Sequence, residues 1–207
     1  MTKSLVVNCS LSGNVSEDLF SAVGKFNECS VVNFMDISSE YIVAKDVDAV
    51  VISGSAARIV QATDRAKFEN VEKLIKNCAV PILGICFGHQ LLCWAFGAKV
   101  ASLPRQVANR FEDVKVNRIG KIFAGFKEGQ TVRLAENHFD YVLKDSLETA
   151  GFTLLADSVS CEVEAVEHKT KPFWGVQFHP ERITIQNEAH PEGHRIIENF
   201  YSDTVKR

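Results

Sequence analysis

The sequence predicts an α/β fold with an open, mostly parallel sheet, helices on both faces, and extra strands in the C-terminal half. Three observations lead to this prediction. In the first half of the chain, short apolar segments alternate with segments whose apolar residues recur at helical spacing. Turn-forming residues bound each apolar segment, as is typical of buried parallel strands. In the second half, strand-like segments follow one another with fewer helices between them.

The first half of the chain is expected to build the parallel part of the sheet. Its predicted strands are short, apolar and rich in valine or isoleucine: residues 5–9, 30–34, 48–52 and 80–85. Its predicted helices are residues 16–25, 64–77 and 88–96. In the second of these helices, apolar residues such as Val71, Leu74 and Ile75 recur at helical spacing. Strands separated by helices in this way favour parallel pairing, because parallel neighbours need a crossover connection.

The second half is expected to add strands and one closing helix. The predicted strands are residues 111–117, 131–135, 152–156, 161–168 and 173–178. The last of them is entered through Pro172, and proline suits the first position of a strand but not its middle. The closing helix is expected at residues 192–201. Because no linker, repeat or low-complexity tract interrupts the chain, one domain spanning residues 1–207 is predicted.

The composition excludes several classes of protein. A hydrophobic content of 46% and a charged content of 24% are ordinary for a soluble globular protein. The net charge of −3, with no basic block, disfavours a nucleic-acid partner. No apolar segment is long enough to cross a membrane and no signal peptide is recognisable, so a cytoplasmic location is expected. The six cysteines form no CxxC pair, which disfavours a zinc site or a thioredoxin-type motif and favours reduced thiols.

A cysteine between two glycines gives the strongest functional signal in the sequence. Residues 84–88 read G-I-C-F-G, after an apolar strand and before an amphipathic helix. This is a nucleophile elbow with cysteine as the nucleophile, and the small residues Gly84 and Gly88 let the strand and the helix approach closely. The N-terminus of a helix favours the thiolate over the thiol. Cys86 is therefore predicted to be a catalytic nucleophile.

A packing role is the simplest alternative for any cysteine, because free cysteine is among the most buried residue types. The two glycines and the strand-to-helix context oppose that alternative for Cys86. The remaining cysteines lack this context and are expected to be ordinary buried thiols: Cys9, Cys29, Cys78, Cys93 and Cys161.

A nucleophilic cysteine needs a base, and the base needs a group that orients it. His179 follows the predicted strand 173–178, and Pro180 and Glu181 come directly after it. Ligands of open parallel sheets bind beyond the carboxyl ends of the strands, so His179 and Cys86 are expected at one sheet edge. A strand-end histidine capped by local polar groups is the alternative. The cysteine elbow at residues 84–88 favours His179 as the base and Glu181 as the residue that orients it.

A second His-Pro-Glu tripeptide begins at His190. The residues before it, 185–189, are polar and predict no strand. His190 and His194 have a spacing that is found in metal sites, but no third ligand is recognisable nearby. A solvated helix start is therefore expected here, without a metal.

Together the two motifs resemble those of the class I, or triad, glutamine amidotransferases. Residues 84–90 read G-I-C-F-G-H-Q and residues 175–181 read G-V-Q-F-H-P-E. The resemblance extends from about Val50 to the C-terminus. It implies a flavodoxin-like open α/β sheet and a triad of Cys86, His179 and Glu181 that hydrolyses L-glutamine through a cysteine thioester.

Further segments are similar to the glutaminase part of GMP synthetase. Residues 136–140, E-N-H-F-D, resemble its S-H-x-D segment, and residues 161–172 and 190–200 are similar to the same family. The resemblance implies a free-standing glutaminase subunit that supplies ammonia to a separate ATP-pyrophosphatase (synthetase) subunit. It implies no metal or organic cofactor in this chain, with ATP and Mg²⁺ bound by the partner. It also implies that Gln90 and His138 contact the substrate.

The resemblance further implies an oxyanion hole formed by the backbone N–H groups of Ser55 and Phe87. The family's turn usually reads S-G-G-P, whereas residues 53–56 read S-G-S-A. Because the donor is a backbone N–H group, Ser55 can still supply it.

Two features leave other functions open. The S-G-S turn also occurs in γ-glutamyl peptidases, and S-L-S-G-N at residues 10–14 replaces the G-Q pair expected after the first strand. A free-standing GMP-synthetase-like amidotransferase or a γ-glutamyl peptidase, acting without a synthetase partner, is therefore the alternative enzyme. A catalytically silent regulatory subunit is a third hypothesis, and the intact Cys86, His179 and Glu181 oppose it.

Overall fold

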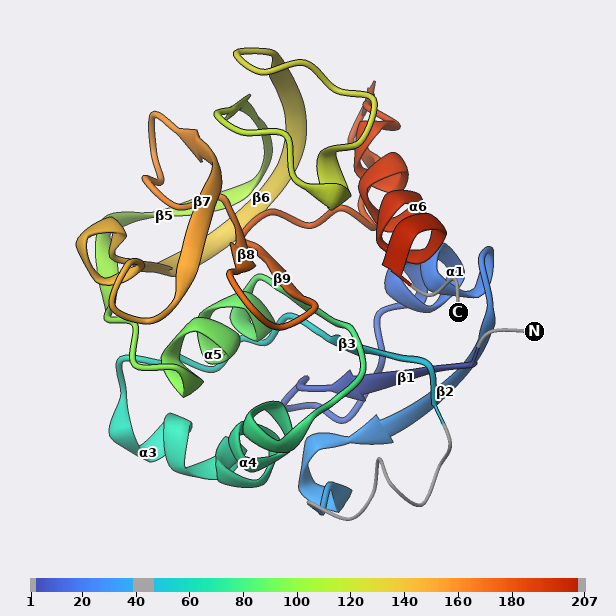
Figure 1. Cartoon of the computed structure of the whole chain (residues 1–207), viewed down its shortest axis with the longest axis vertical. Helices are drawn as coiled ribbons and strands as arrows, with labels where there is room; N and C mark the ends of the chain where they lie inside the picture. The colour runs from blue at the N-terminus through green and yellow to red at the C-terminus, as the bar shows by residue number, and fades with distance from the viewer. Residues whose placement is uncertain (1–2, 39–46, 205–207) are drawn as a thin grey trace.

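The computed structural model describes residues 3–38 and 47–204. A nine-stranded sheet forms its centre, in the order β2-β1-β3-β4-β9-β8-β7-β5-β6 (Figure 1). Five neighbouring strands run parallel: β2 (Glu28–Asn33), β1 (Lys3–Asn8), β3 (Ala49–Ile52), β4 (Ile82–Ile85) and β9 (Phe173–Val176). The other four pair antiparallel: β8 (Ala165–His168), β7 (Phe152–Ser158), β5 (Val100–Val116) and β6 (Thr131–Val142). The predicted fold class, a parallel α/β sheet extended by strands from the C-terminal half, is confirmed.

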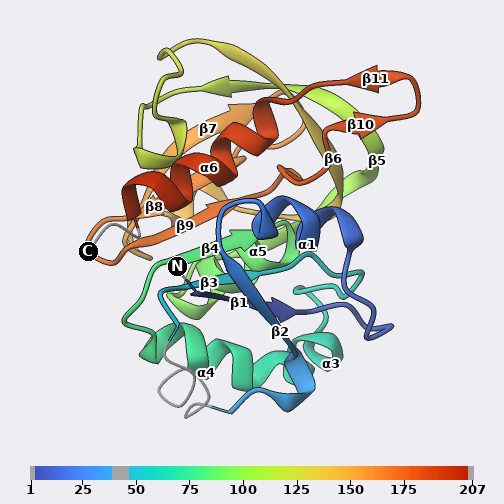
Figure 2. The ribbon, with the colours of Figure 1, turned by 90° about the vertical axis from the view of Figure 1, so that its right-hand side faces the viewer.

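Helices cover both faces of the parallel strands. They are α1 (Glu17–Gly24), α3 (Ala62–Arg65), α4 (Glu69–Asn77), α5 (Phe87–Ala95) and α6 (Glu192–Thr204). Short 3₁₀ turns lie at η1 (Phe34–Asp36), η2 (Ala66–Phe68), η3 (Lys121–Phe123) and η4 (Lys144–Ser146). Leu19 of α1 and Phe200 of α6 belong to the core on one face, and Leu74 of α4 and Leu91 of α5 belong to the core on the other. Figure 2 shows α6 and α1 on one side of β1 and β3 and α4 on the opposite side.

The buried parallel strands explain why the first half of the sequence is easy to interpret. All four residues of β3 and all four of β4 are buried, because helices pack on both faces of the sheet. Hydrophobic side chains are therefore needed at every position rather than at every second one. None of the helices in the described parts of the chain is both long enough and apolar enough to cross a membrane.

The antiparallel strands differ from the prediction in length. β5 begins at Val100, whereas a strand was expected only from residue 111. Its first part contains Pro104 and has Val107 as its one fully buried residue, so neither an apolar run nor alternation marks it. β6 continues seven residues beyond the expected end, to Val142. The even-numbered positions of that extension face inward but include the polar residues Glu136, His138 and Asp140. The alternation of apolar and polar residues that predicts a strand is therefore missing from the sequence.

Three smaller differences concern the last third of the chain. β8 begins at Ala165, so residues 161–164 lie outside the expected strand, and β9 ends at Val176 rather than at residue 178. The segment expected to hold no strand forms a small hairpin of β10 (Thr184–Ile185) and β11 (Glu188–Ala189). Gln186, at its turn, has a positive φ of 55°. Each hairpin strand has only two residues, too few for a periodic signal.

The curl of the sheet places β6 over the carboxyl ends of the central strands. Although β6 is the last strand in the sheet order, the backbone N–H of His179 donates to the carbonyl of Ala135 in β6 at 2.7 Å. The side chain of Gln90 in α5 likewise donates to the carbonyl of Asp140 in β6 at 2.7 Å. The parallel and antiparallel halves therefore meet at the edge where ligands of such sheets bind.

Candidate active site

Cys86 lies at the sharp turn between β4 and α5. Its φ of 51° and ψ of −107° are rare for a residue with a side chain, and such strain is characteristic of functional positions. Its backbone N–H donates to the carbonyl of Val176 in β9 at 2.8 Å, which holds the turn against the neighbouring strand. Cys86 is 4% exposed and lines a pocket.

The two elbow glycines are required by close backbone contacts. A Cβ atom on Gly84 would lie 2.6 Å from the carbonyl oxygen of Gly88. A Cβ atom on Gly88 would lie 2.3 Å from the carbonyl oxygen of Ile52 in β3. Helix α5 therefore packs directly on the backbone of two strands, and this contact fixes where the helix begins and where Cys86 projects.

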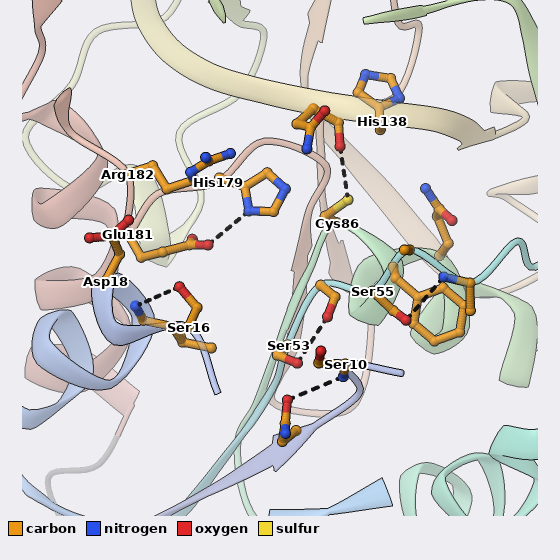
Figure 3. Close-up of a pocket in the computed structure, with 18 of the residues that line it drawn as sticks. Ser10, Ser16, Asp18, Ser53, Ser55, Cys86, His138, His179, Glu181 and Arg182 are labelled. Carbon is orange, nitrogen blue, oxygen red and sulfur yellow. Dashed lines mark hydrogen bonds and ion pairs between the residues drawn. The ribbon is translucent and has the colours of Figure 1, made fainter. Parts of the chain in front are cut away.

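His179 and Glu181 meet at the same edge. His179 Nδ1 and Glu181 Oε1 are 2.8 Å apart, and their side chains are only 12% and 4% exposed. Gly54 lies against both His179 and Cys86: a Cβ atom on Gly54 would be 3.1 Å from His179 Cε1 and 3.6 Å from Cys86 Cβ. The structure thus brings together the three residues that the sequence predicted as a triad (Figure 3).

The electrostatics of the site favour a protonated imidazole. Burial alone would lower the pKa of His179, but the Glu181 carboxylate and the Cys86 thiolate raise it to about 10. His179 is therefore an imidazolium at neutral pH.

The predicted oxyanion donors line the same pocket as Cys86. In the described part of the chain, the N–H groups of Ser55 and Phe87 donate to no protein acceptor, so both are available to a ligand. Ser53 supports the turn, because its hydroxyl donates to the carbonyl of Gly54 at 3.0 Å and accepts from the N–H of Cys9 at 2.9 Å. In a trans peptide the C=O and N–H groups point in opposite directions. The bond to Gly54 therefore helps to set the direction of the Ser55 N–H group.

The pocket beside Cys86 has a volume of about 640 Å³. Its lining includes Cys86 and, from the loop and helix start after β1, Ser10, Ser16 and Asp18 (Figure 3). Many of the lining side chains are polar, which suits a small polar ligand with several hydrogen-bonding groups.

Gln90 and His138, the expected substrate contacts, both line this pocket but bond mainly to the protein. Gln90 Nε2 donates to the carbonyl of Asp140 at 2.7 Å and to Gln177 Oε1 at 3.1 Å, so its amide nitrogen is already occupied. The ring of His138 lies on the side of β6 away from Cys86 (Figure 3), with Nδ1 3.1 Å from the carbonyl of Asp140. Through these bonds, both side chains hold the strand that forms one wall of the pocket.

Two residues that the sequence did not single out for the site help to shape it. Arg58 pairs with Asp140 at 2.6 Å and lies over the ring of Phe139, 4.0 Å from its centroid. His194 Nε2 donates to the carbonyl of Glu181 at 3.2 Å, and Lys25 donates to its Nδ1 at 3.3 Å. The expected solvated helix start is therefore wrong for His194, which is half-buried and supports Glu181. No local sequence motif predicts the contacts of Arg58 or His194, because each contact joins separate elements of the fold.

Comparisons with known proteins agree with this geometry. The family model for glutamine amidotransferase class-I matches residues 6–204. A glutamine-hydrolysing GMP synthase subunit of Methanothermobacter thermautotrophicus is 34% identical over 160 residues, which covers 77% of this chain and 76% of that relative. The corresponding subunit of Methanocaldococcus jannaschii is 36% identical over 157 residues, covering 75% and 73%. A crystal structure from Thermoplasma acidophilum, provisionally assigned as the same GMP synthase subunit, superposes with a TM-score of 0.81 at 30% identity, covering 97% and 92%.

Replacing Glu181 by glutamine should lower the pKa of His179. The carboxylate raises that pKa, so its removal should reduce it from about 10 by about 1 to 3 pH units, the usual effect of one close opposite charge. The measurement is a pH titration of the His179 ring by nitrogen-15 NMR. Glu198→Gln, an exposed change in α6, is the control and should leave the titration unchanged. An unaltered His179 titration in Glu181→Gln would show that the pair does not set the charge of the imidazole.

Replacing Gly88 by alanine should destabilise the protein. The added methyl group would collide with the Ile52 carbonyl, and overpacking of this kind typically costs about 1–3 kcal/mol in the free energy of unfolding. Gly24→Ala is the matched control, because no atom lies within 4 Å of a Cβ at that position. Urea unfolding should separate the two variants, and equal unfolding midpoints would contradict the close contact between α5 and β3.

Proposed function

We propose that this chain, which belongs to the glutamine amidotransferase class-I family, hydrolyses L-glutamine and passes the ammonia to a separate ATP-dependent GMP synthetase subunit. The observation that carries the proposal is the arrangement at one pocket of an elbow cysteine, an imidazolium and its carboxylate partner. The relatives described above are named as glutamine-hydrolysing GMP synthase subunits, which indicates the use of the ammonia.

The first chemical step is attack on the side-chain amide of glutamine. The Cys86 sulfur adds to the amide carbon, and the C=O electron pair moves to the oxygen. In this proposal the backbone N–H groups of Ser55 and Phe87 stabilise this oxyanion, which is supported by their position at the pocket and by the lack of a protein acceptor for either group among the described residues. Losing one such donor typically costs about 3–4 kcal/mol of transition-state stabilisation.

Collapse of the tetrahedral intermediate releases ammonia. The C–N bond breaks, and the imidazolium of His179 gives its proton to the leaving nitrogen, which leaves a γ-glutamyl thioester on Cys86. Neutral His179 then takes a proton from water as the water attacks the thioester, and glutamate departs. Glu181 remains ionised and holds Nδ1–H through the 2.8 Å contact, so it orients the ring in both steps.

With a separate synthetase subunit as partner, this chain has no need to bind ATP itself. Amide hydrolysis by a thiolate and an imidazolium requires no phosphate donor and no metal. In this proposal, ATP and Mg²⁺ act on the synthetase subunit, where they activate the acceptor that ammonia attacks. This chain then contributes only the glutaminase half-reaction.

A γ-glutamyl peptidase is the second candidate, favoured by the S-G-S turn and the size of the pocket. A volume of about 640 Å³ leaves room beyond the glutamyl group for an attached residue. The loop that carries Ser10 borders that space. Such an enzyme would use the same Cys86 chemistry but a peptide nitrogen as the leaving group.

Replacing Cys86 by alanine should abolish glutamate release. Loss of the nucleophile in a comparable triad reduces kcat on the order of 10⁶-fold, and the fold should persist because the side chain shrinks at a pocket. Cys93→Ala, which removes a buried thiol of the same helix, is the control for cysteine loss. Full glutaminase activity in Cys86→Ala would refute the nucleophile assignment.

The partner should decide between the two candidate enzymes. Glutamate release is measured with the chain alone, and then with an archaeal GMP synthetase subunit, ATP and XMP. Strong stimulation by the complete mixture is expected for an ammonia-donating subunit. Full-speed hydrolysis by the chain alone, with γ-glutamyl peptides cleaved faster than glutamine, would instead support the peptidase.

A further inference from the structure

A second cluster of reactive side chains lies inside the curled half of the sheet. His138 of β6 and Cys161 and Glu164 before β8 each contribute one ligand-type atom, and these atoms all lie within 4.8 Å of one another. Glu136 joins them, because its Oε2 is 3.5 Å from His138 Nε2. All four residues are buried, with exposures from 0 to 4%.

The hydrogen bonding of His138 orients a lone pair into this cluster. Its Nδ1 lies 3.1 Å from the carbonyl of Asp140. A carbonyl can only accept, so Nδ1 carries the proton. The other ring nitrogen, Nε2, faces Glu136 and lies 3.5 Å from its Oε2. A histidine that binds a metal through one ring nitrogen usually donates the other N–H to a group such as a backbone carbonyl, as His138 does here.

The cluster contains more acceptors than donors. Both carboxylate oxygens of Glu136, Oε2 of Glu164 and Nε2 of His138 are buried without a hydrogen-bond donor among the described residues. Ser158 donates to the other oxygen of Glu164 at 2.7 Å, so only that atom is satisfied. Buried carboxylates without a cationic partner are costly, and converging lone pairs require a positive species between them.

A shared proton would supply only part of that charge. One proton on Glu136 can bond to His138 or to Glu164, but not to both. A divalent ion can be shared by His138, Cys161 and Glu164, whose ligand-type atoms lie within 4.8 Å of one another, with Glu136 beside His138.

We propose that His138, Cys161, Glu164 and Glu136 form a binding site for Zn²⁺. Imidazole, thiolate and carboxylate are the ligands that Zn²⁺ takes in proteins, commonly four in number and tetrahedral. The thiolate and imidazole disfavour the harder ions Mg²⁺ and Ca²⁺. The inference concerns a different set of residues from the triad and does not depend on the proposed reaction.

A metal here would link two segments that form the wall behind the nucleophile. The peptide carbonyl of Asn137, between Glu136 and His138, lies 3.8 Å from Cys86 Sγ. Zinc would tie this part of β6 to residues 161–164, which come before the start of β8. Its role would be structural, because all four ligands come from the protein and leave no open position.

The test measures zinc binding without the triad thiol. Tag-free Cys86→Ala protein, in which the thiol next to His179 is removed, is equilibrated with Zn²⁺ and its bound metal is measured by mass spectrometry. Stoichiometric binding is expected. Adding Cys161→Ala or Glu164→Gln should weaken it by at least about 100-fold, since a ligand matters no less than the outer-shell groups whose loss costs about 10–100-fold.

Cys93→Ala in the same background is the matched control. Cys93 Sγ is also buried and lies 3.8 Å from a ring nitrogen of buried His89, but no carboxylate takes part in that contact. This variant should keep its zinc. Thermal unfolding of each variant checks that any lost binding comes from folded protein, and Glu164→Gln, which preserves side-chain size, serves if Cys161→Ala does not fold.

Cobalt and infrared spectra separate the metal from the proton. Co²⁺ bound to Cys86→Ala protein should give a thiolate-to-cobalt charge-transfer band that disappears with Cys161→Ala. The proposal is overturned if no stoichiometric metal binds, or if binding survives every ligand change. A protonated-carboxyl infrared band in metal-treated protein, lost in Glu136→Gln, would likewise overturn it in favour of a shared proton.

Discussion

The parallel pairing of β4 with β9 is the constraint on which the site depends. Ile85 pairs with Val176, so the two strands end side by side although about 90 residues separate them in the chain. The next residue after β4 is Cys86, whose N–H bonds to Val176, and three residues after β9 comes His179. The side chains of Cys86 and His179 are thus placed by strand register, and the bond from the His179 N–H to β6 adds a third fixed point.

The curled antiparallel half supplies what the parallel half lacks, a wall over the open sheet edge. Part of the interior beside that wall is polar: Glu136, His138, Asp140, Glu164 and Gln177 are all buried. A hydrophobic interior would pack at lower cost, since each unsatisfied buried acceptor carries a desolvation penalty. Polar cores of this kind persist where they hold a site or bind an ion. The same strand, β6, therefore serves the pocket through its backbone and the buried cluster through its side chains.

A structural feature of this protein can be predicted from the sequence when residues close together in the chain determine it. The elbow at Cys86 and the His179–Glu181 pair were predictable because neighbouring residues impose the geometry, through two glycines and a short strand exit. The full lengths of β5 and β6 were not, because one has few buried positions and the other turns polar residues inward. His194 was assigned to solvent for a related reason: its contact with Glu181 arises from the docking of α6, which no periodicity reveals.

In the proposed reaction, the charge coupling between Cys86 and His179 lets one imidazole perform two opposite tasks. In the resting site, the thiolate and Glu181 keep His179 protonated, with its pKa raised to about 10. Such a group is a poor base for activating water at neutral pH. Formation of the thioester converts the anionic sulfur into a neutral one, which removes one of the two interactions that raise this pKa. The imidazolium therefore becomes more acidic as ammonia leaves, and the ring it leaves behind is neutral when water arrives. Glu181, whose charge does not change, keeps the ring in place throughout.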